Sequence, residues 1–211
     1  MRGKRLGVVA AGVVGVALVV SGCSNSDSSH DMSAMTTPTS AQVSTSAGNA
    51  PAQAHNEADV AFAQGMIPHH RQAIEMADMV LAKQGIDSRV LNLANAIKAA
   101  QGPEIDQMQG WLTEWGVSAP ASGSAMPGHD MGSMGEGMMS EQDMTALRDA
   151  QGVAASKLFL TQMIEHHKGA ITMAQNEIDG GQFPAAVALA HSIVTAQQEE
   201  ITTMQEIVNS L

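Results

Sequence analysis

Four histidines occur as two adjacent pairs, and each pair has methionines on both sides of it. His69 and His70 lie between Met66 and Met76, and the same pattern returns 97 positions later. The repeated group consists of Met66, His69, His70, Met76, Met163, His166, His167 and Met173. Imidazole nitrogens bind copper well, and thioether sulfurs favour Cu(I) over harder ions. The pattern therefore indicates a soft-metal site, with Cu(I) or Cu(II) as the predicted ion.

A second set of residues recurs downstream of each histidine pair. These residues are candidate ligands, or side chains that hold the ligands in place: Gln101, Glu104, Met108, Gln197, Glu200 and Met204. Buried histidines need partners for their ring nitrogens. A structural network is therefore the alternative, in which Glu104 and Glu200 accept imidazole N–H groups and Gln101 and Gln197 satisfy the rest. The residue types alone leave both interpretations open.

Helical spacing explains how these side chains come to face inward. At about 100° per residue, Phe62, Met66, His69, His70, Ala73, Met76 and Ala77 fall within about 120° of one another. We predict helices over 56–82, from Asp87 or Ser88 to about 115, over 141–178, and from Pro184 to near the end. Pro68 should bend the first helix. No strand pattern is present, so we expect an all-α four-helix bundle made of two repeated helical hairpins over residues 56–211.

The N-terminal residues have the layout of an export signal. Arg2, Lys4 and Arg5 precede a short apolar run, which ends in a sequence that resembles a lipoprotein cleavage box at Cys23. We therefore predict a lipoprotein signal peptide over 1–22, lipidation of Cys23, and a disordered tether over 23–55. An ordinary signal peptide or an uncleaved anchor is the alternative. The expected location is the extracytoplasmic side of the cell membrane.

The charge of the mature chain limits its partners. Residues 1–22 hold three of the ten Lys and Arg and none of the 21 Asp and Glu, so their removal makes the formal charge −14. A strongly acidic protein is a poor partner for nucleic acid and a reasonable one for cations. Because Cys23 is the only cysteine, disulfides and thiolate metal sites are excluded.

The linker between the two copies, at about 117–140, is unusually rich in methionine. It contains candidate residues for a flexible metal-binding arm: Met126, His129, Met131, Met134, Met138 and Met139. The triplet His129-Asp130-Met131 also occurs in the tether as His30-Asp31-Met32. We interpret His55 and His191 as ordinary surface residues.

The duplicated Met-x-x-His-His step resembles the domain of unknown function 305 family over about residues 57–211. The resemblance implies an exported, ferritin-like helical bundle, and some family members are linked to copper binding and tolerance. By position it carries over the eight Met and His residues of the repeated group. Glu165 stands where the first copy has Pro68, which leaves the geometry of the second copy open.

Three functions follow as hypotheses. The leading one is a membrane-tethered protein that sequesters copper or passes it to a partner protein. A metal-dependent oxidase using Glu104 and Glu200 is a second, although the Glu-x-x-His step of ferritin-like iron sites is absent, and we expect no enzyme activity. The third is a structural or interaction bundle without metal, whose histidines respond to pH.

Overall fold

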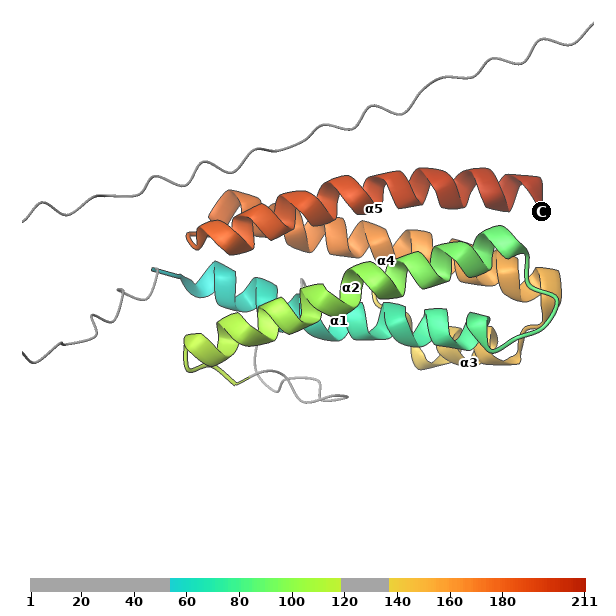
Figure 1. Cartoon of the computed structure of the whole chain (residues 1–211), viewed down its shortest axis with the longest axis horizontal. Helices are drawn as coiled ribbons and strands as arrows, with labels where there is room; N and C mark the ends of the chain where they lie inside the picture. The colour runs from blue at the N-terminus through green and yellow to red at the C-terminus, as the bar shows by residue number, and fades with distance from the viewer. Residues whose placement is uncertain (1–53, 119–136) are drawn as a thin grey trace, which may run out of the picture. The chain divides into compact units, whose positions relative to one another are not determined.

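The computed structural model describes residues 54–118 and 137–211, which form five α-helices and no strand (Figure 1). The helices are α1 (Glu57–Leu81), α2 (Ser88–Glu114), α3 (Glu141–Asp149), α4 (Gly152–Gly180) and α5 (Pro184–Ser210). The signal peptide, Cys23 and the tether up to residue 53 lie outside the described residues. So do Met126, His129, Met131 and Met134. None of the described helices is long and apolar enough to cross a membrane.

Local capping chemistry sets where the helices begin. The Asn56 side chain accepts hydrogen bonds from the first turn of α1, and Asp59 bonds back to the Asn56 amide. Asp87, one of the two predicted candidates, caps α2, and Ser140 caps α3. Pro184 occupies the first turn of α5, where its missing N–H costs nothing. The α1 helix runs through Pro68 without interruption.

The predicted third helix, over 141–178, is wrong in one respect, because the structure divides it into α3 and α4. Ala150 and Gln151 are extended, and Gly152 has a φ of +55°. Glycine adopts this left-handed conformation at little cost, so Gly152 gives the chain a place to turn. The described bundle therefore has one helix more than predicted. This additional short helix, α3, packs against α1 and α4.

The four long helices pack in a chain of neighbours. Helix α1 contacts α2 on one side and α4 on the other, and α5 packs against α4. The inward arc predicted for α1 is confirmed, because every residue of that arc is at most 5 % exposed.

The apolar core consists of two clusters that lie at different levels along the bundle. The first cluster contains buried residues from 73–80, 90–97, 159–164 and 201–207. The second contains buried residues from 62–67, 105–112, 170–174 and 186–193. The late half of α1 thus meets the early half of α4, which makes these two helices antiparallel. Each cluster draws on all four long helices.

Candidate metal-binding site

A polar layer separates the two apolar clusters. Each long helix contributes two of its side chains at this level: His69 and His70, Gln101 and Glu104, His166 and His167, and Gln197 and Glu200. The four histidines are at most 1 % exposed, whereas the two glutamate side chains are each 21 % exposed. The sequence-predicted histidines therefore lie together in the middle of the core, with the glutamates at the edge of the layer.

The α1–α2 pair and the α4–α5 pair each contain the same histidine–glutamate contact. His70 Nε2 lies 2.7 Å from Glu104 Oε2, and His167 Nε2 lies 2.6 Å from Glu200 Oε2. These distances are typical of charge-assisted hydrogen bonds. The predicted pairing of the two glutamates with imidazole rings is confirmed. A carboxylate on Nε2 favours the tautomer with its proton there, which leaves the lone pair on Nδ1.

The hydrogen-bonded network expected from the glutamines does not close. Among the described residues, Nδ1 of His70 and of His167 are buried and have no hydrogen-bond partner. The side-chain oxygens of Gln101 and Gln197 are likewise buried and have no hydrogen-bond partner. The predicted role of these glutamines is therefore wrong for the Nδ1 atoms of His70 and His167. The Nδ1 atoms of His70 and His167 therefore each leave a lone pair in the interior. Burying such an atom without a partner costs free energy.

The two halves of the layer meet through His69 and His166. Their ring centroids are 3.7 Å apart, with the planes inclined by 42°. Burial holds the pKa of His166 well below its usual value, and positive charge on His69, His167 or His70 would lower it further. His166 is therefore a neutral imidazole at neutral pH, the form in which histidine binds metals.

The predicted methionines lie on both sides of the layer. Met66, Met108 and Met173 belong to the second apolar cluster, and Met76, Met163 and Met204 belong to the first. The structure thus brings the four histidines together but separates Met66 from Met163. Among the described residues, no three His, Cys, Asp or Glu side chains are grouped so as to hold a metal ion.

Comparison with known proteins identifies the family. Residues 59–208 match the domain of unknown function DUF305. The chain belongs to the DUF305 family. No curated protein matches the sequence.

Solved structures of other DUF305 proteins have the same fold. A DUF305 fragment from Deinococcus radiodurans is 31 % identical, with a TM-score of 0.65, over 74 % of this chain and 98 % of that one. A DUF305 protein from Streptomyces coelicolor, provisionally described as secreted, is 31 % identical, with a TM-score of 0.66, over 72 % of this chain and 93 % of that one. CopM in its Cu(II)-bound form is also 31 % identical, with a TM-score of 0.61, over 72 % and 96 % of the two chains. CopM has also been solved with Cu(I), with Ag and in the apo form.

Two sequence-based interpretations of this DUF305 chain change in the structure, and a third is confirmed. Met138 and Met139 are half-buried and adjoin the bundle, so they are not part of a free arm. His55 is half-buried and stacks on Trp115, with ring centroids 4.5 Å apart, so it is not an ordinary surface residue. His191 is exposed, as predicted.

Sequence reasoning missed a buried carboxyl pair in this DUF305 bundle. Asp59 accepts hydrogen bonds from the backbone amides of Asn56, Gln182 and Phe183. Burial alone would raise its pKa, but these bonds together lower it. Burial, and after it the adjoining Asp59 carboxylate, raises the pKa of Glu177 to about 8. Glu177 is therefore largely protonated at neutral pH.

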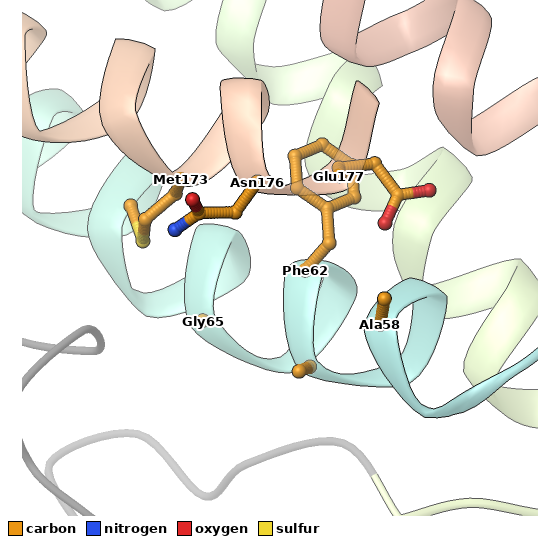
Figure 2. Close-up of a pocket in the computed structure, with 7 residues that line it drawn as sticks. Ala58, Phe62, Gly65, Met173, Asn176 and Glu177 are labelled. Carbon is orange, nitrogen blue, oxygen red and sulfur yellow. The ribbon is translucent and has the colours of Figure 1, made fainter. Parts of the chain in front are cut away.

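A cavity of about 200 Å³ adjoins Glu177, between α1 and α4. Figure 2 shows Met173, Asn176 and Glu177 on α4 beside Ala58, Phe62 and Gly65 on α1. Glu177 continues the inward stripe that includes Phe159, Met163 and Met173. That spacing is the signal by which the sequence could have revealed it.

Proposed function

We propose that this protein binds copper in the polar layer and holds it outside the cell membrane, for sequestration or for transfer to a partner protein. The cargo is Cu(I) or Cu(II), and the candidate ligands are the four histidines with the methionines on either side. The proposal assigns the protein no catalytic role. Its support comes from three sources: the layer, the thioethers beside it, and the likeness to copper-bound CopM.

The observation that carries the proposal is the pair of buried Nδ1 atoms on His70 and His167. Each of these rings is held by a carboxylate through Nε2 and offers its other nitrogen to the interior. In metal sites, a histidine ligand commonly donates its second N–H to such a carboxylate, which fixes the ring and makes it a better ligand. A structural histidine network would instead satisfy both nitrogens.

The methionines decide which metal the layer would prefer. With no group of three His, Cys, Asp or Glu in place among the described residues, thioether sulfur must complete the donor set. Met66 and Met173 could do so from one side of the layer, and Met76 and Met163 from the other. Thioether sulfur favours Cu(I) over zinc and over iron.

The proposal extends to the organisation of the whole chain. Duplication of a helical hairpin is supported by the repeated sequence and by the two His–Glu contacts, and we place the bundle in the ferritin-like class. Signal cleavage after residue 22, lipidation of Cys23 and a tether up to residue 55 would attach the bundle to the outer face of the membrane.

The test measures copper bound to the full chain, purified in mild detergent. The protein is dialysed against mixed copper, zinc and iron, first under reducing and then under oxidising conditions, and bound metal is measured by elemental analysis. His70→Leu combined with His167→Leu removes both Nδ1 ligands and keeps apolar volume in the core. We expect this variant to lose copper affinity by about tenfold or more.

Two controls separate the layer from other sites. His191→Leu removes an exposed histidine from α5 and should leave copper binding unchanged. Replacement of Met126, His129, Met131 and Met134 by serine removes the arm and should leave the copper in the bundle. Equal copper binding by the wild type and the His70/His167 variant would rule out these ligands. A wild type that binds no copper would favour the structural network.

A further inference from the structure

The end of the Met-rich linker is fixed across the boundary between α1 and α4. We call residues Gly137, Met138 and Met139 the strap. The Met139 amide donates to Gln72 Oε1 at 2.7 Å, and Gln72 Nε2 donates to the Met139 carbonyl at 2.9 Å. One side chain of α1 thus holds both backbone groups of Met139.

Gly137 holds the strap against α4 on the other side. It has a φ of +78°, and a Cβ at this position would lie 2.8 Å from both the Glu165 carbonyl oxygen and the Gly169 Cα. Only glycine allows the backbone to approach α4 this closely. The strap therefore has one fixed point on each of the two central helices.

These fixed points flank the contact between His69 and His166. Gln72 is three residues after His69, so the two are neighbours on the surface of α1. Glu165 directly precedes His166, and Gly169 is three residues after it. The strap thus crosses α1 and α4 at the level where the two rings meet, and both rings are only 1 % exposed.

The strap also brings two half-buried methionines to the edge of the core. Met138 is half-buried, and Met139 packs against the apolar cluster that contains Met76 and Met163. A soft cation exchanges readily between thioethers when the next ligand is in reach before the previous one leaves. Copper would remain Cu(I) throughout such an exchange, so no electron donor or acceptor is needed.

We propose that the strap is the route by which Cu(I) reaches the polar layer, with the sulfurs of Met138 and Met139 as its first ligands in the bundle. Gln72 and Gly137 are positioning residues that hold these sulfurs in place. This inference rests on the proposed function, but it concerns the rate of copper uptake rather than the amount bound.

The test is a stopped-flow measurement on the full chain in detergent. Cu(I) is supplied as its complex with bicinchoninate, and loss of the complex's absorbance reports transfer to the protein. The His70/His167 variant serves as the baseline, so that only copper bound in the layer is counted. Met138→Leu combined with Met139→Leu keeps the apolar packing and removes both sulfurs, whereas Gln72→Leu releases the strap and keeps the sulfurs.

We expect both variants to load copper about tenfold more slowly and to reach the same final amount as the wild type. Met79→Leu is the control for the methionines, because Met79 is half-buried against the same cluster but is not in the strap. Gln175→Leu is the control for Gln72, because Gln175 is exposed and its side chain donates a hydrogen bond to Asp179 of its own helix.

Two results would overturn the inference. Unchanged loading in both variants would show that copper enters elsewhere. Faster loading in Gln72→Leu would show that the strap only covers the layer. If the wild type takes up no more copper than the His70/His167 variant, the proposed function itself fails. This result differs from a failure of the entry route alone, in which copper still reaches the layer. Circular dichroism checks that each variant is folded, and Gly137→Val provides a second way to displace the strap without changing Gln72.

Discussion

Replacing Glu177 by glutamine isolates the contribution of one buried proton to the stability of the bundle. In the wild type, the protonated Glu177 carboxyl group adjoins Asp59, which in turn accepts hydrogen bonds from the backbone amides of Asn56, at the start of α1, and of Phe183, in the α4–α5 turn. Glutamine keeps the size of the side chain and can donate an N–H to Asp59, but it does not titrate. The variant should therefore retain the fold and lose the pH dependence.

The size of the effect follows from the difference between the folded and unfolded pKa values of Glu177. The pKa is about 8 in the folded protein, mainly because of burial, against an ordinary value of 4.5. Between these values the folded state holds a proton that the unfolded chain has released. The stabilisation is therefore complete below pH 4.5 and is lost as the pH rises towards 8. The slope is at most about 1.4 kcal/mol per pH unit, or on the order of 2–3 kcal/mol between pH 5 and pH 7.

The assay is urea unfolding followed by circular dichroism at pH 5, 6, 7 and 8. Titration of His166 also changes the stability of the wild type, with the opposite sign, because the pKa of His166 is lowered on folding. The difference between wild type and Glu177→Gln cancels that contribution. We expect the variant to gain on the wild type by about 2–3 kcal/mol from pH 5 to pH 7. Glu75→Gln, at an exposed site on α1, should show no such gain. Parallel pH curves for wild type and Glu177→Gln would refute the reasoning.

Three further predictions concern packing, the α4–α5 turn and the N-terminus. Phe159→Ala should lower the free energy of unfolding, measured in urea, by about 3–5 kcal/mol, because Phe159 is fully buried. The control Val153→Ala, at an exposed position, should change it by less than about 0.5 kcal/mol. Equal losses in the two variants would contradict the described core. Gly181→Ala should destabilise the protein by about 1–3 kcal/mol, because the new Cβ would overlap the Glu177 carboxyl group. A Cβ at Gly180 meets only the Ala58 methyl, at an ordinary 3.5 Å, so Gly180→Ala is the control. Thermal melts of the two variants provide the comparison. Labelling of cells with radioactive palmitate should mark the wild type but not Cys23→Ala, and a labelled variant would exclude Cys23 as the lipid site.

The sequence predicted those parts of the structure that follow from helical periodicity. The spacing of Met66, His69 and Met76 on one arc requires that they share a buried face, so the inward histidines and their glutamate partners could be foreseen. The break at Gly152 could not be foreseen, because an isolated glycine in an otherwise helical pattern is tolerated and does not by itself mark a turn. The strap depends on a contact between Gln72 and Met139, which are 67 positions apart. No local pattern encodes such a contact.

Division of the core by the polar layer also affects how the protein folds. Each apolar cluster takes side chains from both α1–α2 and α4–α5, so neither helical pair can bury a core of its own. An isolated α1–α2 or α4–α5 pair would expose its apolar side chains from both clusters. It would bind another pair to cover these side chains. A chain cut between α2 and α3 should therefore remain a two-fragment complex that melts as one unit. At high concentration, intact molecules could exchange these pairs and form intertwined dimers.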